Sequence, residues 1–194
     1  MGFFDLIIQI DFSILNFIQE FFRCSFLDVI MPFFSNIGEV GIVWIIIGLI
    51  MLFFRKTRSW GIILLCSMLI GYIVGEVAIK NIICRVRPCY FVDINMIVSK
   101  PHSYSFPSGH SCSSFAAATV LLKMNKRFGI PALILASLIA FSRLYNYVHY
   151  PTDVLCGIVL GVLCALLVCY LFKKFRWQKK IDDFGTRSDI NEIS

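Results

Sequence analysis

The sequence predicts an all-α protein: a polytopic bundle of transmembrane helices with five or six membrane segments and an amphipathic amino-terminal helix. Of its 194 residues 58% are apolar and 15% are charged, whereas soluble domains average roughly 45–50% apolar residues. The mean hydropathy is +0.80, and many apolar residues gather in runs close to the length of a membrane helix, about 20 residues. This composition excludes a disordered tail and a basic nucleic-acid-binding surface. We therefore expect membrane lipids, and no nucleic acid, as partners.

Four apolar runs are typical of membrane-spanning helices, and a shorter stretch of small residues at 111–124 predicts a further helix. Between the second and third runs, residues 80–110 turn polar and contain three prolines, which predicts a long loop. Loops of that length usually carry function. The four runs are 40–54, 60–79, 130–148 and 154–172.

The first 36 residues are predicted to form an amphipathic, interfacial segment. In residues 3–22, polar side chains recur among Phe, Leu and Ile at helical spacing, which indicates one polar face of a helix lying in the membrane interface. Residues 26–34 are apolar but short and contain Asp28 and Pro32, so a second interfacial or re-entrant piece is expected there. A single tilted span through 12–34 is the alternative. The polar stripe consists of Asp5, Gln9, Ser13, Asn16 and Glu20.

We expect residues 1–172 to form one membrane-embedded domain and residues 173–194 to form a tail that is first basic and then polar. If the spans alternate in direction, residues 55–58, residues 123–127 and the tail lie on one side and hold 12 of the 18 Lys and Arg residues. The positive-inside rule makes that side cytoplasmic. A multi-pass plasma-membrane protein with a cytoplasmic carboxy terminus is therefore predicted.

The opposite, extracytoplasmic side receives other cations and every histidine. Because Lys and Arg there oppose the insertion rule, we expect them to be retained for a purpose. Three of them, Lys80, Arg87 and Arg143, lie at the outer ends of helices and are expected to bind an anion. A phosphate fits, since Arg donates paired hydrogen bonds to phosphoryl oxygens and Lys supplies a compact charge. Three histidines on the same side indicate acid–base chemistry. These residues are Lys80, Arg85, Arg87, Lys100, Arg143, His102, His110 and His149.

A short motif, Pro107-Ser108-Gly109-His110, precedes a helix rich in Ala and Ser. Ser108 can cap that helix, and the free N–H groups at its start can hold phosphoryl oxygens. Gly109 lets the backbone approach a ligand closely.

His149 and Asp153 are four residues apart at the start of the last span, and Pro151 between them suits the first helical position. The carboxylate can therefore reach the imidazole, fix its tautomer and stabilise the imidazolium that forms when the other ring nitrogen attacks. His110, on another helix, would protonate the leaving oxygen. Each residue alone is a weak signal, because solvated histidines and snorkelling cations are common, but their joint spacing is specific.

In this spacing the chain closely resembles the type 2 phosphatidic acid phosphatase superfamily over residues 38–172. Its three-part signature is matched by Lys80-x6-Arg87-Pro88, Pro107-Ser108-Gly109-His110 and Ser142-Arg143-x5-His149-x3-Asp153. The resemblance implies a helical membrane enzyme that removes a phosphate from a lipid without a metal or another cofactor. It implies His149 as the nucleophile that forms a phosphohistidine, Asp153 as its orienting partner and His110 as the general acid. The implied phosphate-binding residues are Lys80, Arg87, Ser108, Gly109 and Arg143, while His102 lies outside the signature.

The small size resembles that of bacterial members acting on undecaprenyl diphosphate or phosphatidylglycerol phosphate, and hydrolysis of undecaprenyl diphosphate to undecaprenyl phosphate is the expected reaction. Phosphatidylglycerol phosphate and phosphatidic acid are alternative substrates, and a phosphotransferase using the same phosphohistidine is an alternative enzyme. A transporter is disfavoured, because its ionisable groups belong at mid-membrane depth and only Glu39 and Glu76 enter spans. The four strong spans also disfavour a soluble vanadate-dependent haloperoxidase. No obligate protein partner is evident.

Two features leave alternatives open. Glu76 precedes Lys80 by one helical turn, which predicts an ion pair that holds the ammonium towards the phosphate; a protonated carboxyl facing a neighbouring helix fits equally well.

The spacing of the eight cysteines indicates neither a disulfide framework nor a zinc motif. Among them, Cys84 and Cys89 could pair on an exposed loop.

Overall fold

The computed structural model describes residues 2–92, 94–178 and 181, and the regular structure of this part of the chain is helical, without a strand. Two short 3₁₀ turns, Glu39–Gly41 and Pro88–Tyr90, and a π-helical stretch, Ile73–Ile79, connect or extend the α-helices. In chain order the α-helices are α1 (Phe3–Phe22), α2 (Ser25–Ile37), α3 (Ile42–Phe53), α4 (Arg55–Tyr72), α5 (Lys80–Ile83), α6 (Gly109–Met124), α7 (Lys126–Tyr145) and α8 (Pro151–Lys174).

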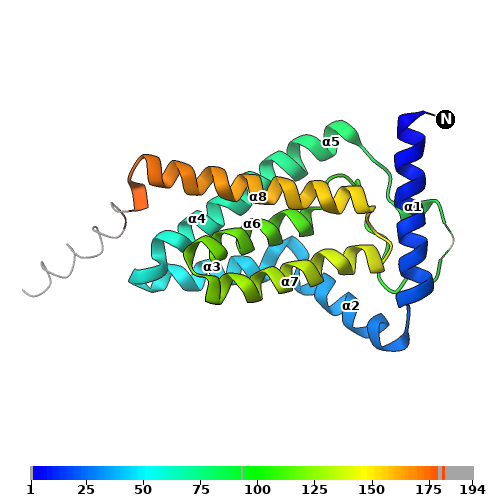
Figure 1. The fold of residues 1–194 in the computed structure, drawn as a ribbon, viewed down its shortest axis with the longest axis horizontal. Helices are drawn as coiled ribbons and strands as arrows, with labels where there is room; N and C mark the ends of the chain where they lie inside the picture. The colour runs from blue at the N-terminus through cyan, green and yellow to red at the C-terminus, as the bar shows by residue number, and fades with distance from the viewer. Residues whose placement is uncertain (1, 93, 179–180, 182–194) are drawn as a thin grey trace, which may run out of the picture.

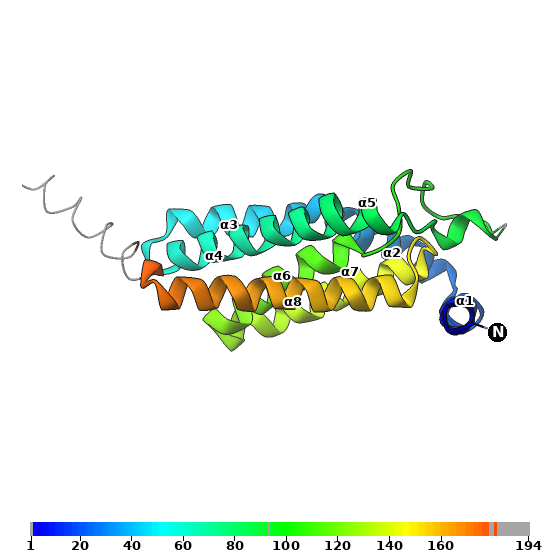
Figure 2. The same ribbon diagram turned by 90° about the horizontal axis from the view of Figure 1, so that it is seen from above.

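Five helices, α3, α4, α6, α7 and α8, run along the long axis of the molecule (Figures 1 and 2). Helix α6 packs against the other four, and its buried residues are mostly Ala, Ser, Cys and Thr. Small side chains let the helix backbones approach closely. A hydrogen bond of 2.9 Å from Trp44 Nε1 to Ser114 Oγ, both buried, joins α3 to α6. The all-helical bundle predicted from the sequence is therefore confirmed.

The predicted five or six membrane segments are not confirmed. Within the described residues, three helical stretches are long and apolar enough to cross a membrane: Arg55–Tyr90, Lys126–Tyr145 and Pro151–Lys174. A fourth is reached if Ser25–Ile37 and Glu39–Phe53, which meet at a bend of 45°, together make one span. Helix α6 has only 16 residues and lies inside the bundle, where packing against its neighbours takes the place of lipid contact.

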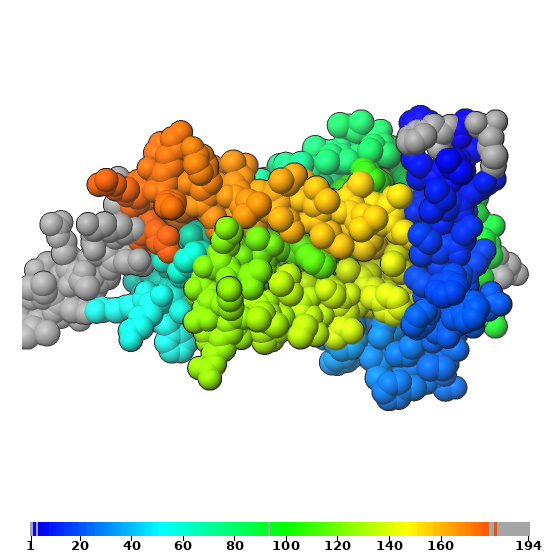
Figure 3. All heavy atoms as spheres, in the orientation of Figure 1, coloured from blue at the N-terminus to red at the C-terminus, as the bar shows by residue number. Residues whose placement is uncertain are grey.

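Helix α1 does not continue into α2, so the alternative of one tilted span through 12–34 is wrong. The backbone is extended at Arg23 and Cys24, and the chain turns there. Helix α1 lies across one end of the bundle, as the dark blue band in Figure 3 shows. The predicted polar stripe is exposed, and so is an apolar strip that contains Ile14, Phe17 and Phe21. A third face of α1 is buried against the bundle.

The polar loop begins later than predicted. Helix α4 continues through the π-helical stretch into α5, so helical structure extends to Ile83 and ends at Cys84, whose φ of 51° is left-handed. All eight cysteines are free, with Cys84 exposed and Cys89 buried, so these two do not form the considered disulfide. Most of the predicted tail, 179–180 and 182–194, lies outside the described residues.

Two glycines of α8 allow its close contact with α6. A Cβ atom at Gly161 would collide with the carbonyl oxygen of Cys112, and one at Gly157 with that of Ser108. These contacts are to backbone atoms, which cannot swing aside as a side chain can. The start of α6 and the start of α8 are thereby held together.

Gly161→Leu should destabilise the bundle, because the added side chain has no space between α8 and α6. Overpacking of this kind costs about 1–3 kcal/mol, which thermal unfolding in detergent measures as a lower melting temperature. Val159→Leu is the matched control, since Val159 lies on the same helix and is 57% exposed. Equal melting temperatures for the two variants would contradict the close packing of α6 against α8.

Candidate active site

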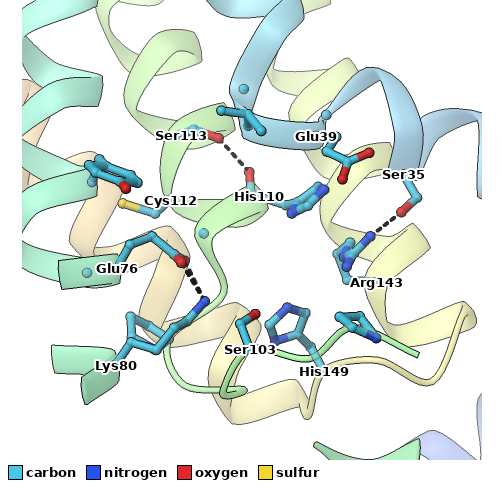
Figure 4. A pocket seen from close by; sticks show the side chains of 18 of the residues that line it. Ser35, Glu39, Glu76, Lys80, Ser103, His110, Cys112, Ser113, Arg143 and His149 are labelled. Atoms are coloured by element: carbon cyan, nitrogen blue, oxygen red, sulfur yellow. Dashed lines mark hydrogen bonds and ion pairs between the residues drawn. The ribbon is translucent and has the colours of Figure 1, made fainter. Parts of the chain in front are cut away.

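A cavity of about 810 Å³ lies among α2, α4, α6 and α7 and is bordered by the loops that follow α5 and α7 (Figure 4). Part of its wall carries cations and histidines, and part is formed by apolar side chains of α3 and α4. Such a cavity suits a molecule with an anionic head and an apolar tail. The apolar part includes Ile45, Leu65, Met68 and Leu69, and the polar part includes Lys80, Arg87, His110, Arg143 and His149.

Lys80 and Glu76 form the ion pair that the sequence predicted as one of two possibilities. Lys80 Nζ donates to both carboxylate oxygens of Glu76, at 2.6 and 2.7 Å. The π-helical stretch delivers both residues, and the Lys80 N–H donates to the carbonyl oxygen of Gly75. Because π-helical turns recur at functional sites, this local departure from α-helical geometry is consistent with a functional role. Both side chains lie on the cavity wall (Figure 4).

Arg87 is almost fully buried and joins two loop segments. Its Nε and Nη2 atoms donate to the carbonyl oxygen and hydroxyl of Ser103, at 2.7 and 2.9 Å, and Nη2 donates to the carbonyl oxygen of Tyr104 at 3.1 Å. Its Nη1 atom donates to the carbonyl oxygen of Val148 at 2.8 Å and lies 3.0 Å from Nε2 of His149. The guanidinium is thus fixed beside the His149 ring.

His149 is 1% exposed and has a defined tautomer in this arrangement. A guanidinium only donates hydrogen bonds, so Nε2 of His149 accepts from Arg87 and the ring proton is assigned to Nδ1. Burial lowers the pKa of His149 to about 3; Asp153 acts in the opposite direction, while the charges of Arg87 and Arg143 lower it further. The imidazole is therefore neutral at physiological pH, with its lone pair on Nε2.

Asp153 lies behind His149 and is completely buried. Its Oδ2 atom is 3.5 Å from Nδ1 of His149 and accepts hydrogen bonds from the Ser105 hydroxyl and from the Tyr150 N–H. Its Oδ1 atom accepts from Arg85 Nη1 at 2.7 Å. The carboxylate is therefore held by the loop before α6, by the loop after α5 and by the start of α8.

The motif at the start of α6 has the predicted cap. The Ser108 hydroxyl accepts from the Ser111 N–H and from the Ser111 hydroxyl, and it is buried outside the cavity lining. Gly109 lies against Glu76 so closely that a Cβ atom would collide with that carboxylate. His110 faces the cavity opposite His149 (Figure 4). Within the described residues, its buried Nε2 atom has no hydrogen-bond partner.

Arg143 borders the cavity from the end of α7. Its Nη1 atom donates to the hydroxyl of Ser35 on α2, and its buried Nε atom has no hydrogen-bond partner among the described residues. Arg143 and His110 thus both border the cavity, and each has a buried nitrogen without a hydrogen-bond partner among the described residues, which is uncommon in a folded protein.

Most of the predicted site residues lie together around the cavity. Its lining also contains His102 and Lys100, which the signature does not include. Among the described residues there is no group of three or more His, Cys, Asp or Glu side chains able to hold a metal ion. The predicted residues on the cavity wall are Glu76, Lys80, Arg87, Gly109, His110, Arg143 and His149; Ser108 and Asp153 lie behind it.

Sequence reasoning missed three residues that support Asp153: Ser105, Arg85 and Asp11. Asp11 is on α1, and its Oδ2 atom pairs with Arg85 Nη2 at 2.7 Å. The sequence contains one indication of a buried role for Asp11, because this acid lies on a different face of α1 from the polar stripe. Arg85 is one of the cations that the sequence predicts on this side of the membrane, but it belongs to no motif that indicates its role, and Ser105 belongs to no recognisable pattern.

A helical membrane bundle whose buried cations and paired histidines surround an amphipathic cavity belongs to the class of membrane enzymes that act on lipids with an anionic head. The family model described as PAP2 superfamily matches residues 60–177, and the chain belongs to this superfamily. The protein is a membrane lipid phosphate phosphatase. The resemblance drawn from the three-part signature is thereby confirmed.

Relatives with defined activities support the same family. The chain is 38% identical over 158 residues, covering 80% of this chain and 74% of the relative, to the undecaprenyl-diphosphatase of Sulfolobus acidocaldarius. It is 34% identical over 160 residues, covering 75% of each protein, to phosphatidylglycerophosphatase B of Bacillus subtilis. The crystal structure of a transmembrane PAP2-type phosphatidylglycerolphosphate phosphatase from Bacillus subtilis superposes with a TM-score of 0.69 and 32% identity, covering 86% of each chain.

Glu76→Gln should lower kcat/KM by about tenfold, or ~1.4 kcal/mol, with the fold intact. The carboxylate holds the Lys80 ammonium at the cavity and reduces the repulsion among Lys80, Arg87 and Arg143 when no phosphate is bound. The measurement is kcat/KM across pH, with Glu20→Gln on the exposed side of α1 as control. A profile identical to that of the unmodified protein would mean that Glu76 contributes only to packing.

Proposed function

We propose that this protein hydrolyses the terminal phosphate of a polyprenyl diphosphate through a phosphohistidine at His149. The observation that carries the proposal is the buried, neutral imidazole whose Nε2 lone pair is at the polar part of the cavity, between Arg87 and the facing His110. In the first step Nε2 attacks phosphorus and the bond from phosphorus to the leaving oxygen breaks. In the second, water attacks the phosphohistidine, and inorganic phosphate leaves.

The phosphoryl group would be bound by charges that already surround an empty space. Lys80 and Arg143 border the cavity with their cationic groups, and the Gly109 and His110 N–H groups stand at the positive end of α6. Arg87 donates through Nη1 to Nε2 of His149, and this hydrogen bond would pass to a phosphoryl oxygen as Nε2 attacks. Because these donors are fixed before the substrate arrives, they stabilise the extra negative charge of the five-coordinate phosphorus at little reorganisation cost. Ser108 would act indirectly, by capping α6 and holding its first turn in place.

His110 would be the general acid and base. Its Nε2 atom has no partner within the described residues. Burial and the charge of Arg143 hold the pKa of His110 well below 6.5, so the ring would take up a proton as the anionic substrate binds, give it to the leaving oxygen and later take one from the attacking water. Asp153, bound through Oδ2 near Nδ1 of His149, would stabilise the positive charge that the ring acquires on attack. No step requires a metal ion.

A polyprenyl diphosphate is favoured over other lipids by the Sulfolobus acidocaldarius relative, whose name gives undecaprenyl diphosphate as its substrate class. Phosphatidylglycerol phosphate is the second candidate, because a relative and a solved structure from Bacillus subtilis carry that name. The cavity suits either substrate, since both combine a phosphate with long apolar chains.

We place the site on the extracytoplasmic side of the plasma membrane. The junctions from α3 to α4 and from α6 to α7, with their basic clusters, and the end of α8 lie at one end of the bundle, away from α1 (Figure 1). The positive-inside rule favours a cytoplasmic location for that end. The phosphate-binding cations are then at the opposite, outer end.

Purified protein assayed with excess chelator should release phosphate from undecaprenyl diphosphate with a higher kcat/KM than from phosphatidylglycerol phosphate, phosphatidic acid or diacylglycerol diphosphate. His149→Ala should reduce turnover by on the order of 10³-fold or more, because the nucleophile is lost. The control is Lys56→Ala, which removes an exposed lysine at the start of α4, outside the cavity lining. Preference for phosphatidylglycerol phosphate would overturn the substrate assignment, and an active His149→Ala variant would overturn the mechanism.

A further inference from the structure

A buried acid on α1 is joined to the site from outside the cavity. Asp11 has no exposed surface, although neighbouring residues on α1 face outwards. Its Oδ1 atom accepts from the Thr152 N–H at 3.0 Å, and its Oδ2 atom accepts from the Thr152 hydroxyl at 2.6 Å and from Arg85 Nη2 at 2.7 Å. Thr152 precedes Asp153 in the chain, and Arg85 is bound to Asp153. The contacts of Asp11 therefore lead to the buried site and not to the protein surface.

Arg85 connects the two buried carboxylates. One guanidinium nitrogen, Nη2, pairs with Asp11, and the other, Nη1, pairs with Asp153 at 2.7 Å. Nη1 also donates to the Thr152 hydroxyl at 2.7 Å. The guanidinium carbon stacks 3.8 Å from the centre of the Tyr150 ring. Both terminal nitrogens of Arg85 are thus paired and its plane is stacked on an aromatic ring, the arrangement in which a guanidinium interacts most strongly.

We propose that Asp11 is a positioning residue for the reaction, acting through Arg85 on Asp153. Arg85 alone would hold Asp153 in place but cancel its negative charge. With Asp11, the cluster of two carboxylates and one guanidinium keeps one net negative charge directly behind His149. That charge stabilises the positive imidazole ring formed when Nε2 attacks phosphorus, so Asp11 affects the chemical step without touching the substrate. The inference rests on the proposed function, in which His149 is the nucleophile.

The same helix also holds the loop that carries His149. The Tyr147 hydroxyl donates to Asn16 Oδ1 at 2.9 Å, and Gln19 Nε2 donates to the carbonyl oxygen of Tyr145 at 2.7 Å. Leu15 packs against Tyr147 and Tyr150 in a buried cluster. The hydrogen bonds of Asn16 and Gln19 dock α1 without reaching Arg85 or Asp153. They therefore provide the control that separates docking of the helix from the electrostatic role of Asp11.

Asp11→Asn keeps the shape of the side chain and removes its charge. We expect it to lower kcat by about tenfold, with KM unchanged and the melting temperature within the range of the control variants. Asn16→Ala removes a docking contact of the same helix and should leave kcat within about twofold of the unmodified protein. If α1 only needs to dock against the bundle, Asp11→Asn and Asn16→Ala should instead change kcat equally.

A double-mutant cycle tests the path through Arg85. In an Arg85→Gln background, Asp11→Asn should change kcat by less than about twofold, because the residue that transmits its effect is gone. If Asp11→Asn and Arg85→Gln lower kcat independently, so that the double variant shows the product of the two effects, the proposal is wrong. It is also wrong if Asp11→Asn has the same kcat as the unmodified protein. His149→Ala is measured in the same assay: if it stays active, the proposed function fails, whereas an inactive His149→Ala with an unaffected Asp11→Asn refutes only the role of Asp11.

Discussion

A carboxylate without exposed surface needs a partner for each of its oxygens, and Asp153 obtains them from separate parts of the chain. Leaving such a charge unpaired costs several kcal/mol, so the segments that supply Ser105, Arg85 and the Tyr150 N–H must converge for the bundle to be stable. Their convergence brings together the long loop, the end of the α4–α5 helix and the start of α8. The need to pair Asp153 also positions His149, because the residues on either side of His149 are bound: the Val148 carbonyl oxygen to Arg87 and the Tyr150 N–H to Asp153.

The membrane setting explains how so many charges are tolerated in a small apolar protein. The cations of the site stand at one end of the bundle, where Glu76 balances Lys80 and where Arg87 donates to loop carbonyl oxygens. The remaining length of the bundle is packed through the small residues of α6 and the glycines of α8. A lipid head can therefore bind among fixed charges while its chains stay in contact with apolar walls. This separation of a charged end from apolar walls is what the lipid phosphatase activity of the family requires.

The sequence predicted much of the site because the signature residues lie at ends of consecutive helices, which a bundle necessarily brings to one face. It offered the Glu76–Lys80 pair, which is local to one helix, as one of two alternatives, and the structure contains the pair. It did not predict the course of α1, since an exposed polar stripe is equally compatible with several ways of packing. The contact between Asp11 and Arg85 joins residues 74 positions apart, and no local pattern encodes it. The predicted count of five or six membrane segments is not confirmed, because only three helical stretches of the described residues, or four if the bent pair is one span, are long and apolar enough to cross a membrane.

The account depends most on covalent catalysis at His149, and trapping the intermediate tests that claim directly. Substrate labelled in its terminal phosphate is mixed with the protein, quenched within milliseconds under alkaline conditions and digested for mass spectrometry. The predicted result is label on the peptide that contains His149, stable to base, lost in acid and missing from His149→Ala. Label on a serine or aspartate, or turnover at the normal rate with no labelled protein at any quench time, would contradict the account.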